Sequence, residues 1–288
     1  MIIFFESGKL GNQIFQYTFL KTIQKNNEKI ILFGFEELFN VFEINDNRII
    51  KFSIKSKWRR RMVYKVIKPF IELFSNVNLI NSIQVEYEKV LHNYRRESTK
   101  YNMKKGLIKK ITLVKTGYFQ SEIFFDKNLL CKLKIKEDLI KRANQFLKPI
   151  EKKYKVFVHI RRGDYKNLKV YGKSALLPMN YFHQQIKWFL ENKKNVYFIF
   201  LSDEPSFIEE EFNYLDNKII SNNSYEVDFA IMTLCNGAIL SPSSFGWWGS
   251  YLMKDRDVVF APKYWLGFNS KINYHKEPLA NFMIIVEI

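Results

Sequence analysis

Short apolar runs, rich in β-branched and aromatic residues, alternate along this chain with stretches in which apolar residues recur at helical spacing. Polar or glycine-containing segments bound the runs, as they bound buried strands. Residues 9–26 and 178–194 are helix-like, and Pro178 stands where the first turn of the second helix begins. This alternation is typical of βαβ units and predicts an α/β fold. Strands are expected at residues 2–5, 29–33, 111–114, 155–160, 196–201, 218–220, 237–240 and 257–260.

The same pattern divides the chain into two predicted domains, residues 1–150 and 151–288. A chain of 288 residues is long enough for two domains of ordinary size. Pro149 ends a helix-like stretch, and a new strand begins a few residues later. Charge changes there as well, because residues 1–150 hold 29 basic and 14 acidic side chains whereas residues 151–288 hold 17 and 15. The two domains are therefore expected to meet different partners.

Composition narrows the class of protein. Hydrophobic residues make up 47% of the chain and aromatic residues 17%, which is ample for packed cores. No run of about eighteen apolar residues occurs, and Glu6 halts the opening apolar run, so we expect neither a signal peptide nor a transmembrane helix. Cys131 and Cys235 lie far apart in the sequence, which predicts no disulfide framework and suits a reducing cytoplasm.

Residues 51–70 carry eight basic side chains and no acidic one. Apolar residues are interleaved with them at roughly helical spacing, which is typical of an amphipathic segment that binds an anionic membrane surface. A solvated helix face is the alternative interpretation. Nucleic acid is a weaker third candidate, because basic charge alone selects no particular polyanion. The interleaved residues are Trp58, Met62, Val63, Val66 and Ile67.

The densest cluster of candidate chemistry follows the predicted strand 155–160. Because side chains alternate along a strand, His159 and Arg161 share one face, whereas Arg162 begins the turn. Arginine suits a diphosphate, since its planar guanidinium donates two parallel hydrogen bonds and stays charged. We therefore predict that Arg161 binds phosphate beside His159. Asp164 is expected to pair with one of the arginines and fix its orientation, and a catalytic base is its second possible role. The alternative interpretation of the whole cluster is a surface salt bridge at the end of a strand.

Three other segments place polar residues directly after an apolar strand, where ligands of α/β sheets bind. The glycine loop 7–13 aims backbone amides at an anion or a sugar, although Asn12 and Gln13 as helix caps explain it as well. Residues 202–205 suit a ribose or an acceptor hydroxyl, or the cap of a helix beginning near Pro205. Residues 241–249 offer serine hydroxyls and helix-start amides to phosphate, and the two tryptophans there are expected to pack in the core. Asp228 begins a helix-like pattern, and its carboxylate is also suited to the N1 and N2 edge of guanine.

Taken together, these segments resemble the α-1,2-fucosyltransferases of glycosyltransferase family 11, in order as well as in content. The resemblance spans most of the chain, and the HxRRGDY and SSFxWWG motifs are its most specific part. The matching segments are GxLGNQxFQY at 8–17, GYFQSE at 117–122, HIRRGDY at 159–165, SDE at 202–204, DxAxM at 228–232, SSFxWWGxxL at 243–252 and APKYW at 261–265.

The resemblance implies a GT-B-like fold, with two Rossmann-like domains, a cleft between them and the nucleotide on the carboxyl-terminal domain. It implies an inverting transfer of L-fucose from GDP-β-L-fucose to the 2-hydroxyl of a terminal galactose, without a metal or another cofactor. By the same resemblance His159 and Asp228 contact guanine, and Arg161 contacts the β-phosphate. Ser243 and Ser244 are then expected near the phosphates, and Asn12 and Gly11 are expected to bind the donor near the reacting centre.

Several expectations complete this hypothesis. The base that takes the proton from the acceptor hydroxyl is not identified, and Glu6, Asp164 and Glu204 are the candidates. The D-x-D sequence at residues 255–257 is expected to begin a strand and to bind no metal. Synthesis of O-antigen or capsule repeat units is the expected role, with a lipid-linked acceptor and peripheral attachment to the inner face of the inner membrane. A transferase for another GDP-sugar is the first alternative. A basic module that binds membrane or nucleic acid, with no enzymatic activity, is the second.

Overall fold

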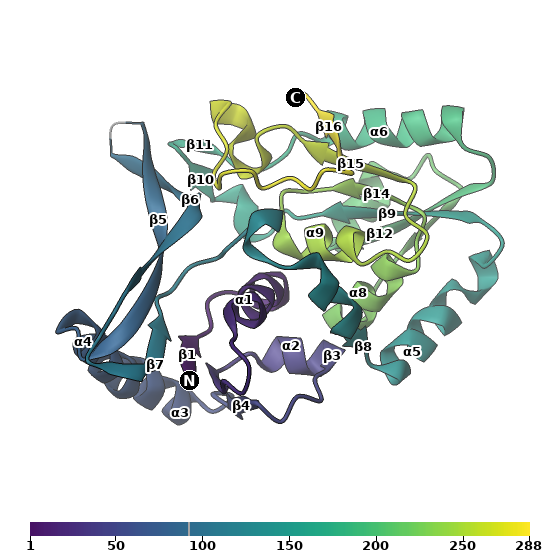
Figure 1. The fold of residues 1–288 in the computed structure, drawn as a ribbon. Helices are drawn as coiled ribbons and strands as arrows, with labels where there is room; N and C mark the ends of the chain where they lie inside the picture. Colours follow the sequence, from purple (N-terminus) through teal and green to yellow (C-terminus); the bar gives the residue numbers. More distant parts are fainter. Residues whose placement is uncertain (92) are drawn as a thin grey trace. The chain divides into compact units, whose positions relative to one another are not determined.

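The computed structural model describes residues 1–91 and 93–288, and these form two compact units (Figure 1). Unit 1 comprises Met1–Lys134 together with His275–Glu277, and unit 2 comprises Ile135–Tyr274 and Pro278–Ile288. Each unit has its own six-stranded sheet with helices packed on it.

Unit 1 is built on a sheet in the order β4-β2-β1-β7-β5-β6. Its strands are parallel except for β6, which forms a long antiparallel hairpin with β5. The strands are β1 (Ile2–Phe5), β2 (Ile30–Phe33), β4 (Ile49–Phe52), β5 (Ile80–Leu91), β6 (Tyr94–Lys104) and β7 (Ile108–Val114). The helices are α1 (Leu10–Ile23), α2 (Glu36–Val41), α3 (Lys57–Met62), the π-helical turn η1 (Val63–Ile67) and α4 (Lys68–Asn76), with short β3 (Phe42–Glu43), η2 (Glu122–Phe124) and η3 (Lys127–Lys132).

Unit 2 has an all-parallel sheet in the order β13-β12-β9-β14-β15-β16. The strands are β9 (Tyr154–Ile160), β12 (Val196–Ser202), β13 (Lys218–Ile220), β14 (Gly237–Leu240), β15 (Val258–Pro262) and β16 (Ile284–Val286). The helices are α5 (Glu137–Leu147), α6 (Met179–Asn192), α7 (Pro205–Glu211), α8 (Tyr225–Thr233) and α9 (Ser244–Tyr251). Shorter elements are η4 (Lys148–Ile150), η5 (Asp164–Lys166), β10 (Lys169–Val170), β11 (Lys173–Ser174) and η6 (Trp265–Ser270), and β8 (Lys134–Ile135) straddles the division between the units.

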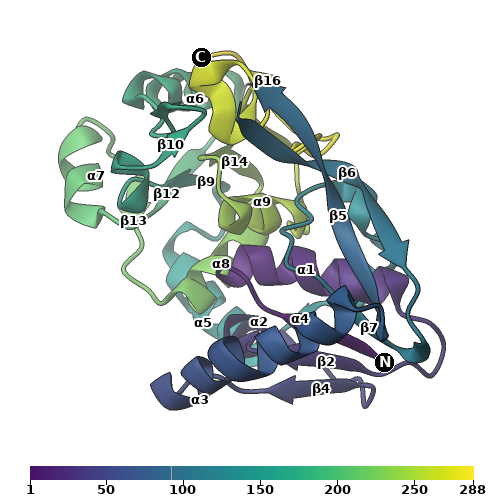
Figure 2. The same ribbon diagram turned by 90° about the vertical axis from the view of Figure 1, so that its left-hand side faces the viewer.

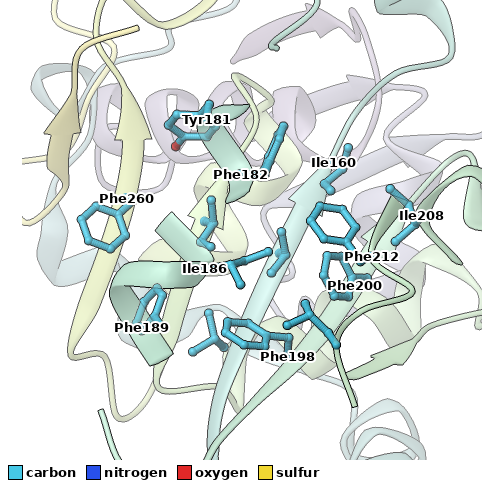
Figure 3. Close-up of a cluster of buried hydrophobic side chains, with 14 of the residues drawn as sticks. Ile160, Tyr181, Phe182, Ile186, Phe189, Phe198, Phe200, Ile208, Phe212 and Phe260 are labelled. Atoms are coloured by element: carbon cyan, nitrogen blue, oxygen red, sulfur yellow. The ribbon is translucent and has the colours of Figure 1, made fainter. Parts of the chain in front are cut away.

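A cluster of buried hydrophobic side chains in unit 2 lies between its sheet and helix α6 (Figure 3). Phe182, Ile186 and Phe189 of α6 are buried against aromatic residues of β12 and β15, including Phe198, Phe200 and Phe260. Gly237 allows β14 to approach this helix, because a Cβ there would stand 2.8 Å from the Phe189 ring. Burial on this scale holds β9 rigidly in the centre of the sheet.

The α/β fold predicted from the apolar runs is confirmed, and each predicted strand lies close to an observed one. The two units divide the chain at residues 134 and 135, ahead of the expected boundary near residue 150. Helix α5 belongs to unit 2 because its buried face, formed by Leu139, Ala143 and Leu147, packs against α8. Pro149 does follow the end of α5, but this helix opens the second unit and does not close the first.

The basic segment 51–70 is largely helical, yet its apolar residues do not share one face. Val63 is buried and Ile67 packs against the core of unit 1, whereas Trp58 and Val66 are exposed. Grouping all of them on one membrane-facing surface was therefore wrong for Val63 and Ile67. The helix needs an apolar face to pack on its own sheet, and these two residues supply part of it.

Candidate active site

Strand β9 occupies the position in the sheet of unit 2 where chain order reverses. From β9 the chain continues outward to β12 and β13, then returns to β14 on the other side of β9. Ligands of parallel α/β sheets bind outside the carboxyl ends of strands at such a switch point. His159 is in register with Leu201 of β12 and Leu240 of β14, so the loops after these strands meet around residues 159–164.

Arg161 is held at the end of β9 by two carboxylates. Its Nε donates to Asp164 Oδ1 at 2.8 Å, and its Nη1 lies 3.1 Å from Asp203 Oδ2. Its backbone amide donates to Ser241 Oγ at 3.0 Å. Burial acts to lower the pKa of Arg161, but the bond to Asp164 and the charge of Asp203 raise it overall. The guanidinium is therefore fully charged and aimed, and its remaining N–H donors are available to an anion.

Asp203 lies over the turn that follows β9. Its two carboxylate oxygens accept hydrogen bonds from the amides of Arg162 at 3.0 Å and Gly163 at 3.1 Å. A Cβ on residue 163 would stand 2.6 Å from Asp203 Oδ2, which explains the glycine. Consecutive amides beside an arginine form a cradle for an anion, and here an aspartate carboxylate occupies it. The helix predicted near Pro205 does begin there, but Asp203 does not cap it.

Arg162 points away from Arg161 and into a separate ion-pair cluster. Its Nε donates to Glu204 Oε2 at 3.0 Å, and its guanidinium lies 3.6 Å from the centre of the Phe207 ring. Lys166 also pairs with Glu204. The bonds to Lys166 and Arg162 lower the pKa of Glu204. A carboxylate engaged by two cations is a weak base, so the arrangement favours a structural role for Glu204.

His159 is a neutral, buried imidazole. Burial, together with the charge of Arg161, lowers its pKa to about 4. Its Nδ1 has no hydrogen-bond partner among residues 1–91 and 93–288. The ring lies against helix α9, since a Cβ on Gly246 would stand 3.1 Å from His159 Cγ. A neutral histidine here can donate or accept a hydrogen bond without adding charge.

Asp228 and the two serines lie on the helices that flank this strand end. Asp228, in the first turn of α8, accepts a hydrogen bond from Ser221, and burial raises its pKa to about 6. Ser243 caps α9, with its Oγ accepting from the Phe245 amide at 3.3 Å, and Ser244 is the first residue of the helix. Phe229 of α8 packs 5.6 Å from Phe245 of α9, which ties the two helices together.

Two further features of α9 and its loop bear on the prediction. Trp247 and Trp248 are buried, and Trp247 stacks on Tyr251 with ring centres 4.7 Å apart, so the expected packing role is confirmed. Tyr165, which the sequence did not single out, donates its hydroxyl to the Pro242 carbonyl at 2.8 Å. Its position as the last residue of the HxRRGDY motif is the sequence feature that could have identified it.

The glycine loop of unit 1 is shaped by its own polar contacts. Gly8 has φ +86°, and a Cβ there would stand 2.2 Å from Asn12 Nδ2. Asn12 Oδ1 accepts from Gln120 Nε2 at 2.7 Å. The amide of Leu10 is capped by Glu37 Oε2 at 2.7 Å, so neither Asn12 nor Gln13 acts as the helix cap.

Glu6 lies beside this loop at the end of β1. Its Oε2 accepts from Gln13 Nε2 at 2.7 Å and from the Phe35 amide at 2.6 Å. Burial raises its pKa, and the bond from the Phe35 amide opposes this. Glu6 also lines a cavity of about 360 Å³ together with Gly8 and Gln13. The structure therefore places Gly11, Asn12 and Glu6 in unit 1, and all other candidate residues in unit 2.

Within residues 1–91 and 93–288, no group of three histidine, cysteine or acidic side chains is arranged to hold a metal ion. In the D-x-D sequence, Asp257 accepts a hydrogen bond from the Tyr154 hydroxyl at 2.7 Å and pairs with Lys193. In the same described part, no helix is both long and apolar enough to cross a bilayer.

A parallel α/β sheet with a fixed arginine and a neutral histidine at its switch point is suited to bind an anionic ligand such as a nucleotide phosphate. The family model described as glycosyl transferase family 11 matches residues 1–278. The chain therefore belongs to glycosyl transferase family 11, as its motifs predicted.

Curated relatives agree with this assignment. An alpha-1,2-colitosyltransferase from Escherichia coli is 28% identical over 90% of each chain. The O-antigen biosynthesis glycosyltransferase WbnK, also from Escherichia coli, is 27% identical over 92% of this chain and 95% of its own. Galactoside 2-alpha-L-fucosyltransferase SEC1 from Bos taurus is 29% identical over 37% of this chain and 30% of its own.

Two solved structures share the fold. The fucosyltransferase NodZ from Bradyrhizobium has a TM-score of 0.50 at 10% identity, covering 88% of this chain and 92% of its own. A family 9 glycosyl transferase from Veillonella parvula has a TM-score of 0.55 at 14% identity, covering 100% of this chain and 85% of its own. The predicted GT-B-like architecture, with two Rossmann-like units, is thereby confirmed.

Proposed function

We propose that the protein transfers L-fucose from GDP-β-L-fucose to the 2-hydroxyl of a terminal galactose, with inversion at the fucose anomeric carbon. The observation that carries the proposal is Arg161, held in place and charged at the switch point of a parallel sheet. The alpha-1,2 linkage and the galactoside acceptor come from the names of the relatives.

The donor site in this proposal is made by residues of unit 2. Arg161 binds the β-phosphate and stabilises GDP as it leaves an oxocarbenium-like fucose, a role for which other transferases use a divalent cation. Ser243, Ser244 and the first amides of α9 bind the remaining phosphate oxygens. His159 and Asp228 recognise guanine, with the Asp228 carboxylate accepting from guanine N1–H and N2–H. We propose no metal and no other cofactor.

Binding of a diphosphate requires Arg161 to exchange partners. Its present carboxylate partners, Asp164 and Asp203, carry the same charge as the phosphates. The side chain of Asp164 is 64% exposed and that of Asp203 is 24% exposed. Asp164 also follows Arg161 by only three residues in the chain, in the same turn. We propose that Asp164 orients Arg161 in the empty site and yields to the phosphate when GDP-fucose binds.

Gly11 and Asn12 of unit 1 are proposed to contribute to donor binding near the reacting centre. Since the ion pairs of Asp164 and Glu204 favour positioning roles, Glu6 becomes our candidate for the base that takes the acceptor proton. A raised pKa suits a general base, because the group then accepts a proton readily near neutral pH. Glu6→Gln removes the carboxylate but keeps a side-chain carbonyl oxygen that can accept the hydrogen bonds from Gln13 Nε2 and the Phe35 amide. The variant therefore tests the base with little disturbance of the loop.

The direct experiment uses the full chain, GDP-fucose and a panel of β-galactosides, and the product linkage is determined by NMR. We expect fucose on the 2-hydroxyl of galactose in the α configuration. A product with another linkage, or no product from any galactoside, would remove the proposal.

A colitose donor is a second candidate, because a colitosyltransferase matches this chain over 90% of its length. Colitose differs from fucose by lacking the 3-hydroxyl. A site that hydrogen-bonds a hydroxyl rejects an analogue without it by about four orders of magnitude, whereas an apolar site discriminates weakly. Competition between GDP-fucose and GDP-colitose for one acceptor therefore distinguishes the two donors through the ratio of their kcat/KM values.

We also propose a place for the reaction in the cell. One relative is named for O-antigen biosynthesis, and the amino-terminal half of this chain is strongly basic. These features support assembly of O-antigen or capsule repeat units on a lipid-linked acceptor, with the enzyme in the cytoplasm and attached peripherally to the inner face of the membrane. Transfer to an acceptor in lipid vesicles, compared with the same glycan free in solution, tests this role.

A further inference from the structure

A long surface helix in unit 1 carries apolar residues on two adjacent faces, one packed on the sheet and one exposed. It runs from Lys57 to Asn76 through α3, the π-helical turn and α4. The residues at both junctions keep helical dihedral angles. Pro69 has no amide hydrogen to donate, and the wider turn just before it accommodates this loss. Spacing along the whole segment can therefore be read as that of one helix.

One face of this helix packs on the sheet of unit 1 (Figure 2). Its Val63 is part of a core cluster that includes Phe5 and Leu113. The Tyr64 hydroxyl donates to the backbone carbonyl of Glu6 at 2.8 Å. These contacts anchor the helix and fix which side it turns away from the protein. The residues of this inner face are Val63, Tyr64, Ile67, Ile71 and Phe74.

The neighbouring face is also apolar, yet it is exposed, and the ring centre of Phe70 on it lies 4.5 Å from that of Phe74 on the inner face. Val66, Phe70, Leu73 and Val77 follow one another at intervals of four, three and four residues, which places them on one side of the helix. Each of them is more than half exposed. Trp58, two turns before Val66, is 70% exposed. A contiguous apolar stripe of this kind on a soluble unit is typical of an interaction site.

The stripe continues onto a neighbouring turn and is surrounded by basic side chains. The Leu107 amide donates to the carbonyl of Asn78, next to Val77, at 3.0 Å, and Leu107 is 82% exposed. Between residues 57 and 77 the single acid is Glu72, which pairs with Lys68. Exposed basic residues on the helix, on the turn and on the ends of β6 and β7 that flank the turn are Lys57, Arg59, Arg60, Arg61, Lys65, Lys104, Lys105, Lys109 and Lys110.

We infer that this surface docks on an anionic lipid bilayer. We call it the docking face: Trp58, Val66, Phe70, Leu73, Val77 and Leu107 with the basic residues around them. The apolar side chains enter the boundary between headgroups and acyl chains, and the basic side chains pair with anionic headgroups. The inference deepens the peripheral attachment proposed above and rests on it for its biological purpose.

Charge and apolarity together select lipid over other occupants. A second copy of the chain would bring two strongly basic faces together, which is electrostatically unfavourable. A nucleic acid would satisfy the charges but leave the apolar stripe in water. An anionic bilayer can pair with the basic side chains and also bury the apolar stripe.

Trp58 provides a direct readout with the full chain. Trp247, Trp248 and Trp265 are buried and Trp188 is partly buried, so a change in tryptophan emission on contact with lipid reports chiefly on Trp58. We expect a blue shift with vesicles of equimolar phosphatidylcholine and phosphatidylglycerol, and quenching when the acyl chains are brominated. Both signals should be absent in Trp58→Phe, which still binds the vesicles in a sedimentation assay.

Two sets of variants separate the apolar from the charged contribution. Phe70→Ser with Leu73→Ser should weaken vesicle partitioning at least about tenfold, from lost apolar burial. Arg59→Gln, Arg61→Gln and Lys65→Gln together should weaken it about a hundredfold, from lost headgroup attraction. Matched controls are Ile123→Ser with Leu190→Ser, both exposed, and Lys141→Gln, Lys152→Gln and Lys194→Gln together, also exposed. The controls should bind as the original protein does.

The outcomes distinguish the docking face from the proposed function. Transfer to a soluble galactoside should be unchanged in every variant, so a chain that binds vesicles but transfers no fucose contradicts only the proposed activity. Vesicle binding without any change in Trp58 emission would overturn the docking face. So would a dimer that Phe70→Ser with Leu73→Ser disrupts, or binding to single-stranded RNA in the absence of binding to vesicles.

Discussion

The hydroxyl of Tyr165 donates a hydrogen bond to the backbone carbonyl of Pro242 at 2.8 Å, and this bond joins the turn after β9 to the loop between β14 and α9. The first loop carries Arg161 and the second carries Ser243. Burial raises the pKa of Tyr165, so its hydroxyl stays a donor at every working pH. Tyr165 is thus a positioning residue that fixes the distance between two parts of the proposed phosphate site.

Tyr165→Phe tests this link, since it removes one oxygen and keeps the ring. Loss of the bond should cost about 1 kcal/mol of unfolding free energy. We expect KM for GDP-fucose to rise several-fold while KM for the galactoside is unchanged, because only the donor loops lose their connection. Steady-state kinetics with each substrate varied in turn, together with urea unfolding, measures both effects. Equal changes in the two KM values would indicate a merely structural role.

Arg161→Ala should lower kcat/KM for GDP-fucose about a hundredfold or more, because a preorganised donor to the leaving group contributes on the order of 3 kcal/mol to the barrier. Arg161→Lys should also fail, since an ammonium cannot reproduce the planar bidentate geometry. Arg162→Lys is the matched control, because Arg162 pairs with Glu204 and points away from the site. A folded Arg161→Ala variant with near-original turnover would exclude the assignment.

Asp228 should make GDP binding sensitive to pH. Its pKa is raised to about 6, so the carboxylate that accepts from guanine is present above pH 6 and becomes protonated below it. The Kd for GDP should therefore rise as pH falls through about 6, toward a tenfold loss per pH unit. Isothermal titration calorimetry measures this.

Asp228→Asn provides the control for the pH effect. The variant should bind GDP weakly at every pH and lose the extra rise below pH 6. It should also discriminate less between GDP and IDP, since inosine lacks the 2-amino group that Asp228 is proposed to accept from. A variant that keeps the original pH profile would assign the titration to another group.

Much of the fold could be predicted because both sheets are built from short, continuous apolar runs such as residues 155–160. Those runs are buried on both faces, which makes them recognisable without knowledge of their partners. The hairpin of β5 and β6 was missed, since many of its residues are polar and exposed. The division between the units was placed after α5 because the sequence does not reveal that this helix packs against α8.

The site was predicted in part for the same physical reason. His159 and Arg161 follow from alternation along a single strand, a purely local property. The contacts of Asp203 with residues 162 and 163, and of Tyr165 with Pro242, join segments about 40 and 77 residues apart. Such contacts depend on the parallel register of β9 with β12 and β14, which no local pattern determines.

The most direct test of the account is transfer from GDP-fucose to lactose in the presence of excess chelator, with the product linkage determined by NMR. We predict that the original protein forms the α-1,2-linked product at the same rate with and without chelator, because Arg161 takes the place of a cation. Loss of transfer in chelator that added Mg²⁺ or Mn²⁺ restores would contradict the account.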